Sequence, residues 1–345
     1  MSVKKSLVFV LCLVVAFSLV AAGCGGKKEE PKKAEGKKIS IKMSVTTPSD
    51  SSPWNIAAKK WAELVKERTK GRVEITTFPN EQLSSGNQQK GIEQVASGVT
   101  GASIHSTIIY SVIEPKLAVV SMPWILPNNA AVDKAMKGAP GEEIKKLVRA
   151  KGIEPLAFGE NGFRHWTNSK KPLTSPEDMK GLKMRVPGMK MYISLFKAIG
   201  ADPTAMSFSE VFTSLQQGTI DGQENPISVI YTSKLQEVQK YLTICNYSYD
   251  PLILGINKKL YDSMDKETQE ILKKSAEEAM ALNIKLTRED ETKQLEDMKK
   301  KNGLQVNVLT PEQIKVFQAA TASVYKEQEP IIGKALLDMF IAAGK

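Results

Sequence analysis

A strict alternation of apolar and polar side chains runs through Ile39-Ser40-Ile41-Lys42-Met43-Ser44-Val45. Because successive side chains of a strand point to opposite faces, this pattern predicts a half-buried β-strand. Apolar residues then recur at helical spacing from Trp54 to Val65, before Gly71 and a second alternating stretch from Val73 to Ile75. These segments together predict a β-α-β unit, and we expect an α/β protein.

A comparable passage recurs later in the chain. We expect one helix from Gln88 to Gly98 and another from Ser209 to Gly218, each ending at a glycine before a short strand. About 300 residues exceed one comfortable core, so two related α/β lobes facing one cleft are expected. Two unrelated helix ends would produce the same likeness. Further on, Asp265 to Lys301 predicts one long, charged helix, and Thr310-Pro311-Glu312 predicts the start of a final helix.

The N-terminus has the features of an export signal. Two lysines precede an uncharged apolar run from Leu7 to Val20, which ends in Ala21-Ala22-Gly23-Cys24. A short membrane span is the alternative, but small residues directly before a cysteine favour cleavage. This ending resembles a bacterial lipobox, which implies a signal peptide over residues 1–23 and a lipid on Cys24. Residues 24–38 are rich in Gly, Lys and Glu, which predicts a flexible tether.

Charge and cysteine content narrow the class of protein. The formal net charge of +10 is partly carried by the signal and tether, and the remaining surplus suits small anionic ligands or an anionic membrane surface. Nucleic-acid binding would need clustered basic residues interleaved with aromatics, so we expect none. With Cys12 in the signal and Cys24 lipidated, Cys245 is left alone, which excludes an intrachain disulfide and predicts a buried, inert thiol.

Signatures of catalysis are missing from the sequence. It contains no nucleophile elbow, zinc-protease helix, phosphate loop or glycine-rich dinucleotide fingerprint. Its two histidines, His105 and His165, are sixty residues apart and predict no metal site. We therefore expect a protein that is not an enzyme and that carries neither cofactor nor metal.

One predicted strand carries a candidate anion-binding residue. In Gly181-Leu182-Lys183-Met184-Arg185-Val186-Pro187-Gly188, the apolar side chains share one face, and Lys183 and Arg185 share the other. Open α/β sheets bind ligands at the carboxyl ends of their strands, where Arg185 lies. A guanidinium can hold a carboxylate with two parallel hydrogen bonds. The alternative is a structural salt bridge from Arg185 to Asp178 or Glu210.

The surrounding sequence resembles the solute receptors of TRAP (tripartite ATP-independent periplasmic) transporters, the DctP family. The likeness covers about residues 39–301. It rests on Gly162-Phe163-Arg164-His165-Trp166-Thr167-Asn168, Pro176-Glu177-Asp178-Met179-Lys180-Gly181-Leu182-Lys183-Met184-Arg185-Val186-Pro187, Leu215-Gln216-Gln217-Gly218-Thr219-Ile220-Asp221-Gly222-Gln223-Glu224-Asn225-Pro226, Phe78-Pro79-Asn80-Glu81-Gln82-Leu83 and Met122-Pro123-Trp124.

The resemblance implies a periplasmic-binding-protein-like fold of the type II Venus-flytrap kind, with a hinge and long C-terminal helices. Lobe I would comprise residues 39–160 plus about 250–285, and lobe II residues 161–249 plus about 286–345. The closed lobes would hold a small organic acid and dock on a two-component integral membrane permease driven by an ion gradient. We expect an extracytoplasmic protein that Cys24 anchors to the membrane surface. A carboxylate receptor for an ABC transporter or for a sensory partner is the alternative.

The resemblance also implies a ligand-binding set. Arg185 matches the carboxylate-binding arginine, Arg164 a second ligand-side arginine, Asn225 a hydrogen-bonding asparagine, Phe208 an aromatic that packs on the ligand, and His105 a polar contact of the first lobe. Structural alternatives exist for Arg164, for Asn225 in a turn before Pro226, and for Phe208 in the core. Trp54 and Trp124 are expected in helical or core packing, with the pocket wall as the alternative.

Two further features bear on this site. Ser207 and Glu210 have the spacing of a capping box. Tyr247 and Thr100-Gly101 stand where many relatives carry a histidine and an acidic residue. The polarity of the pocket is therefore expected to differ from that of dicarboxylate receptors, and the number of carboxylates on the ligand stays open.

Overall fold

The computed structural model describes residues 38–345, which form one compact unit. The predicted signal peptide (1–23), Cys24 and the predicted tether up to residue 37 lie outside the described residues. Nine strands form one sheet: β1 (Ile39–Val45), β2 (Val73–Phe78), β3 (Ala102–Ser106), β4 (Ile153–Asn168), β5 (Lys183–Val186), β6 (Asp202–Ala205), β7 (Gly222–Asn225), β8 (Tyr241–Asn257) and β9 (Gln305–Val308).

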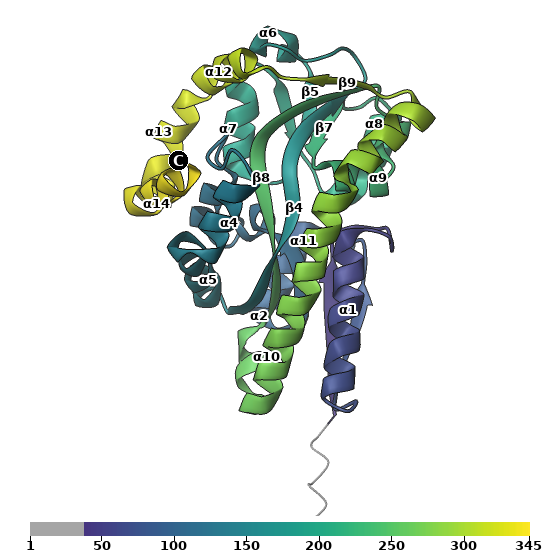
Figure 1. Cartoon of the computed structure of the whole chain (residues 1–345), viewed down its shortest axis with the longest axis vertical. Helices are drawn as coiled ribbons and strands as arrows, with labels where there is room; N and C mark the ends of the chain where they lie inside the picture. The colour runs from purple at the N-terminus through teal and green to yellow at the C-terminus, as the bar shows by residue number, and fades with distance from the viewer. Residues whose placement is uncertain (1–37) are drawn as a thin grey trace, which may run out of the picture. The chain divides into compact units, whose positions relative to one another are not determined.

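The sheet repeats one arrangement on either side of two long strands. Its order is β2-β1-β3-β8-β4-β7-β5-β6, and β9 pairs with β8. Strand β1 is parallel to β2 and β3, just as β5 is parallel to β6 and β7. The long strands β4 and β8 lie side by side and antiparallel (Figure 1). β4 is also antiparallel to β7 and β8 to β3, whereas β8 is parallel to β9. The α/β class is confirmed, and the exact lobe boundaries stay a prediction.

The predicted β-α-β unit at the start of the fold is confirmed. Strands β1 and β2 pair from Ile39 with Val73 onward, and α1 (Pro53–Arg68) connects them. The Ser52 hydroxyl caps this helix, because its Oγ accepts a hydrogen bond from the Asn55 backbone N–H at 3.2 Å. Apolar residues of α1 then pack against the strands in the core around Trp61.

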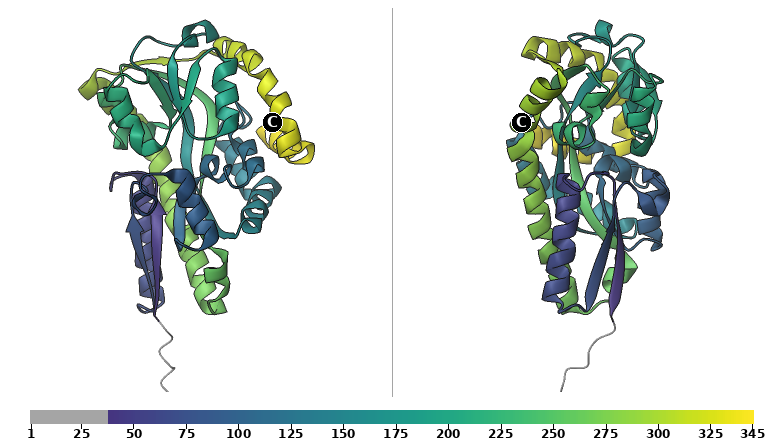
Figure 2. Two further views of the ribbon diagram at one scale, coloured as in Figure 1. Left: turned by 180° about the vertical axis from the view of Figure 1, so that it is seen from behind. Right: turned by 90° about the vertical axis from the view of Figure 1, so that its right-hand side faces the viewer.

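The helices fill both sides of the sheet and the C-terminal end of the chain (Figure 2). The α-helices are α1, α2 (Gln88–Ser97), α3 (Thr107–Tyr110), α4 (Asn129–Lys137), α5 (Ala139–Ala150), α6 (Pro176–Met179), α7 (Lys190–Ala198), α8 (Val211–Gln216), α9 (Ile227–Thr232), α10 (Lys258–Asp262), α11 (Lys266–Asn302), α12 (Pro311–Ala320), α13 (Ala322–Ile332) and α14 (Lys334–Gly344). Short 3₁₀ helices are η1 (Gln82–Ser84), η2 (Pro115–Ser121), η3 (Phe208–Glu210) and η4 (Leu235–Glu237).

The predicted long helix is confirmed as α11, which spans 37 residues. It begins at its cap Asp265 and ends at Gly303, as the charge pattern and glycine indicate. Figures 1 and 2 show α11 and α1 side by side, and the Trp61 indole N–H donates to the backbone carbonyl of Leu272 at 3.0 Å.

Two predictions about helix ends are wrong. Thr310 does cap α12, but α12 is not the final helix, because the chain restarts as α13 after Thr321 and as α14 after Gly333. The Ser207–Glu210 capping box does not form, since the Ser207 side chain makes no capping hydrogen bond. Instead, the Gln88 side-chain carbonyl accepts from the Phe208 backbone N–H at 3.2 Å, and the segment starts as the 3₁₀ turn η3.

Among residues 38–345, every helix is too short or too polar to cross a bilayer.

Candidate functional site

Four of the five predicted ligand-binding residues line one pocket. They are Arg164 on β4, Arg185 near the end of β5, Phe208 on η3 and Asn225 at the end of β7. The pocket holds about 360 Å³ of space free of protein atoms, including its opening to solvent. The N-terminal part of the chain adds Thr46, Thr47, Trp54, Gln88 and Ser106 to the pocket wall.

Arg185 reaches this pocket because strand alternation points it away from the core. Its neighbours Met184 and Val186 are fully buried among apolar side chains, whereas Lys183 is exposed. The Arg185 guanidinium donates from Nε and Nη2 to the backbone carbonyl of Met206, at 3.0 and 2.7 Å. Its central carbon also lies 5.8 Å from the centre of the Phe208 ring. These contacts fix the guanidinium and leave Nη1 without a protein acceptor among the described residues.

Arg185 is a buried cation without a counter-ion. Only 1% of the residue is exposed, yet no carboxylate within residues 38–345 forms an ion pair with it. Asp178 instead accepts from the Thr174 backbone N–H at 2.9 Å and lies 3.6 Å from the Lys171 ammonium. Glu210 is exposed and makes no ion pair in this part of the chain. The alternative of a structural salt bridge from Arg185 to Asp178 or Glu210 is therefore wrong.

The protonation state of Arg185 follows from its surroundings. Burial lowers the pKa of Arg185 to about 10, while the nearby Glu224 carboxylate opposes that shift. The guanidinium therefore keeps its charge at neutral pH. A charge that is desolvated without a partner is costly, which favours any anion that reaches it.

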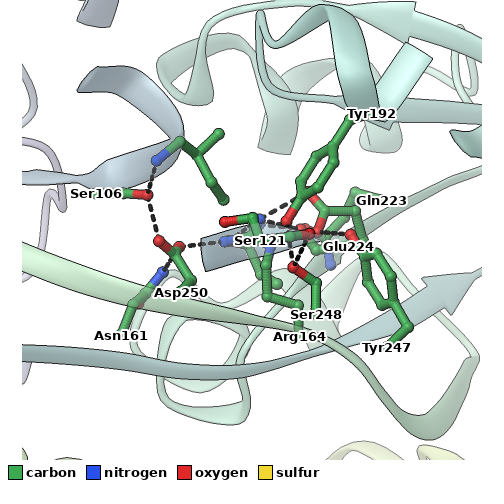
Figure 3. A network of polar contacts seen from close by, with 12 residues as sticks. Ser106, Ser121, Asn161, Arg164, Tyr192, Gln223, Glu224, Tyr247, Ser248 and Asp250 are labelled. Atoms are coloured by element: carbon green, nitrogen blue, oxygen red, sulfur yellow. Dashed lines mark hydrogen bonds and ion pairs between the residues drawn. The ribbon is translucent and has the colours of Figure 1, made fainter. Parts of the chain in front are cut away.

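Arg164 is the opposite case, because carboxylates already surround it (Figure 3). Its Nε and Nη2 donate to the Glu224 carboxylate, the second at 2.6 Å, and its Nη1 donates to Asp250 Oδ2 at 2.7 Å. Burial opposes the charge of Arg164, but these two carboxylates raise its pKa well above the ordinary value. Arg164 thus lines the pocket while most of its donors are engaged within the protein.

Asp250 is an acidic member of the pocket wall that sequence reasoning missed. It lies on β8, is fully buried, and accepts hydrogen bonds from the Ser106 hydroxyl, the Asn161 amide at 2.7 Å and Arg164. Asn161 in turn accepts from the Trp54 indole N–H at 3.1 Å. Burial raises the pKa of Asp250, and the charge of Arg164 and the two neutral donors oppose this effect.

Glu224 lies behind the pocket and joins Arg164 to Tyr247 (Figure 3). The Tyr247 hydroxyl donates to the Glu224 carboxylate, and burial followed by the charge of Glu224 raises the pKa of Tyr247 well above its usual range. The phenol is therefore neutral and acts as a donor. Glu224 belongs to the motif that includes Asn225, but only the pairing of β4 with β7 reveals that it faces Arg164.

Asn225 is held at the pocket by its side-chain contacts. Its Oδ1 accepts from Arg164 Nη2 at 3.0 Å, and its Nδ2 donates to Gln223 Oε1 at 2.5 Å. Its own strand, β7, pairs with β4, and Asn225 lies opposite His165 in that pairing. Asn225 thus shapes the strand end and faces the pocket at once.

His105 does not line this pocket. It is fully buried on β3, with Nδ1 2.8 Å from Ser103 Oγ and Nε2 2.8 Å from Glu81 Oε1. Glu81 also accepts from the hydroxyls of Ser44 and Thr46, at 2.8 and 2.7 Å. His105 therefore belongs to a buried polar cluster behind Thr46, and its predicted ligand contact stays a prediction.

The remaining candidates divide between wall and core. Trp54 lines the pocket, whereas the Trp124 indole N–H donates to the Cys245 carbonyl at 3.1 Å, and its ring packs against Tyr247. Cys245 is buried as predicted, and burial raises the pKa of its thiol. Within residues 38–345, no group of three histidine, cysteine or acidic side chains is arranged to hold a metal ion.

Comparisons with known proteins cover most of the chain. The model of the family described as DctP, bacterial extracellular solute-binding protein, family 7, matches residues 44–330. The 2,3-diketo-L-gulonate-binding periplasmic protein YiaO of Escherichia coli (strain K12) is 35% identical over 95% of this chain and 93% of its own. A TRAP periplasmic solute binding protein from Ralstonia eutropha H16, with bound (S)-2-acetolactate, has 37% identity and a TM-score of 0.85 over 88% of this chain and 98% of its own. Another from Sulfurospirillum deleyianum DSM 6946, with bound succinate, has 30% identity and a TM-score of 0.83 over 89% and 99%.

Proposed function

Because the chain belongs to the DctP family of TRAP periplasmic solute-binding proteins, we propose that its pocket captures a small organic acid by the acid's carboxylate, with Arg185 as the main contact. The family is one of binding proteins rather than enzymes. The captured acid would then pass to a TRAP-type permease of two membrane components.

The observation that carries this proposal is the uncompensated charge of Arg185. The guanidinium is buried and fixed by Met206, and it lacks an ion-pair partner among the described residues. A carboxylate can accept two parallel hydrogen bonds from such a group and supply the missing charge. Related proteins were crystallised with acetolactate and with succinate, which are small organic acids.

Asn225, Phe208 and Arg164 are proposed as supporting contacts. Asn225 keeps one amide hydrogen beyond its bond to Gln223, and the Phe208 ring lies beside the Arg185 guanidinium. Arg164 would act mainly by holding Asn225 and Asp250 in place. His105 would act indirectly through its contact with Glu81.

The lobes and the membrane anchor belong to the same proposal. The pocket wall draws on residues 39–160 through Trp54, Gln88 and Ser106, and on residues 161–249 through Arg185 and Asn225. A hinge between the proposed lobes, with residues about 250–285 in the first and 286–345 in the second, would let them close on the acid. Cleavage before Cys24 and lipidation of its sulfur would hold the receptor at the extracytoplasmic membrane surface. Mass spectrometry of the membrane fraction tests this, and an unmodified N-terminus would contradict it.

The proposed function is tested by calorimetry on the chain that follows Cys24. A screen of sugar acids, oxo acids, hydroxy acids and dicarboxylates should yield a ligand, which stabilises the fold by about 2.7 kcal/mol at a hundredfold excess over Kd. Arg185→Ala should cost about 2 to 5 kcal/mol of binding, which is at least about thirtyfold in Kd.

Lys183→Ala is the matched control, because Lys183 is an exposed cation on the same face of β5. It should leave Kd unchanged. The proposal fails if no acid binds, or if Arg185→Ala folds and binds as tightly as the wild type.

A further inference from the structure

The two arginines of the pocket differ in how many carboxylates they contact. Arg164 and Arg185 are the only cationic side chains in the pocket wall formed by the described residues. Arg164 contacts the carboxylates of Glu224 and Asp250, whereas Arg185 contacts neither. The pocket therefore offers one unpaired positive charge to a ligand, and one is sufficient for a single carboxylate.

Asp250 places a negative charge in the same wall. It accepts from Ser106, Asn161 and Arg164, three donors that suit an ionised carboxylate. A carboxylate has about four lone-pair positions, so roughly one is left for a further donor. A hydroxyl group of a ligand can donate there, whereas a second ligand carboxylate only accepts hydrogen bonds and carries the same sign of charge.

The other polar groups of the wall are neutral. Thr46, Thr47 and Gln88 can exchange hydrogen bonds with hydroxyl or oxo groups, but they cannot balance a second carboxylate. Like charges a few ångströms apart in a desolvated site repel strongly, and this repulsion discriminates between ligands of equal size.

We infer that Asp250 is a specificity-determining residue, an inference that rests on the proposed function. Asp250 selects organic acids with one carboxylate and a hydroxyl group at the far end over the corresponding dicarboxylates. Arg185 holds the carboxylate, and Asp250 accepts from the far end of the ligand. The wild-type protein therefore prefers the monocarboxylate in any pair that differs only at that end.

Three ligand pairs test this inference by calorimetry: 4-hydroxybutanoate with succinate, 5-hydroxypentanoate with glutarate, and gluconate with glucarate. In the pair that binds best, the wild type should bind the monocarboxylate at least tenfold more tightly. Asp250→Asn removes the charge at nearly constant shape, and it should reduce that preference at least tenfold, chiefly by tighter binding of the dicarboxylate.

Asp133→Asn is the matched control, because Asp133 also pairs with an arginine, Arg288, at 2.8 Å, but lies outside this pocket. It should leave the preference unchanged. If the wild type binds the dicarboxylate as tightly as the monocarboxylate or more tightly, the inference is overturned but the proposed function is not. The same holds if Asp250→Asn weakens the binding of both ligands of a pair equally. If Asp250→Asn does not fold, the wild-type preference decides. If no pair binds and the wider acid screen also fails, the proposed function falls with it.

Discussion

At the scale of single residues, the two arginines of the pocket show what local sequence can and cannot predict. Strand alternation and the following Pro187-Gly188 were enough to predict that Arg185 points away from the core. The family resemblance implied that Arg164 is a second ligand-side arginine, with a structural role as the alternative, and Glu224 and Asp250 occupy most of its donors. Those carboxylates reach Arg164 only through the pairing of β4 with β7 and β8, which the local pattern does not encode.

Glu224→Gln tests the structural role of this network. The Glu224 carboxylate binds Arg164 and Tyr247 in the buried interior, so its loss leaves a buried cation with one carboxylate fewer. We expect the free energy of unfolding in urea to fall by about 3 kcal/mol. The exposed Glu210, which makes no ion pair among the described residues, supplies the control. Glu210→Gln should change stability by less than about 0.5 kcal/mol, and equal effects of the two variants would contradict the proposed difference.

At the scale of helices and strands, prediction succeeded where the signal is local. The first β-α-β unit and α11 were predicted from periodicity and end signals within each segment. The division of the C-terminal region into α12, α13 and α14 was missed, because the prediction used only the helix start at Thr310. Ser207 had the spacing of a capping residue, but Gln88, more than one hundred residues earlier in the chain, satisfies the first amide instead.

Gly222 at the start of β7 provides a test of strand positioning. A Cβ atom there would collide with the Thr167 carbonyl oxygen and would lie 2.7 Å from Met184 Sδ. Gly222→Ala should therefore push β7 away from β4, cost about 1 to 3 kcal/mol of stability and weaken ligand binding through Asn225. Urea unfolding and calorimetry measure the two effects.

Gly218→Ala is the companion variant. Gly218 has a φ of +69°, and no other atom lies within 4 Å of the place that a Cβ would take, so only backbone strain of about 1 kcal/mol is expected. Ligand affinity should not change. If Gly222→Ala leaves both stability and affinity intact, β7 is not held as closely as the geometry indicates.

Arg288 on α11 joins two acidic groups whose pKa values shift in opposite directions. Burial raises the pKa of Glu160, although the charge of Arg288 opposes it, whereas the hydrogen bond from Arg288 lowers the pKa of Asp133. A raised pKa means that folded Glu160 holds a proton that the unfolded chain has already released. Glu160 therefore destabilises the fold as pH rises above the ordinary carboxyl pKa, about 4.3.

Glu160→Gln should accordingly gain stability relative to the wild type as pH rises from about 4 toward 7. Asp133→Asn should show the opposite trend in a lower pH window, losing stability relative to the wild type as pH rises toward about 4. The lowered pKa of Asp133 contributes stability above the ordinary carboxyl pKa, and this is lost as pH falls through the folded value. Urea unfolding at several pH values measures both trends, and slopes of the same sign would contradict this assignment.

At the scale of the whole molecule, the site depends on contacts between distant parts of the chain. Trp54, Ser106, Asn161 and Asp250 form one chain of hydrogen bonds, although they span nearly two hundred residues. The fold class and the family could be predicted from sequence, since motifs near Arg164, Arg185 and Asn225 are local. The charge balance of the pocket could not, because it depends on which distant carboxylates the sheet brings to each arginine.

The most direct test of the central claim is a calorimetric double-mutant cycle that uses the best acid found in the screen and its primary amide. Binding of each is measured to the wild type and to Arg185→Ala. If Arg185 binds the carboxylate, the acid loses at least about thirtyfold in affinity in the variant. The amide, which binds weakly to the wild type, should lose far less. An equal loss for acid and amide would contradict the account, because Arg185 would then act on the shape of the pocket and not on the charge of the ligand.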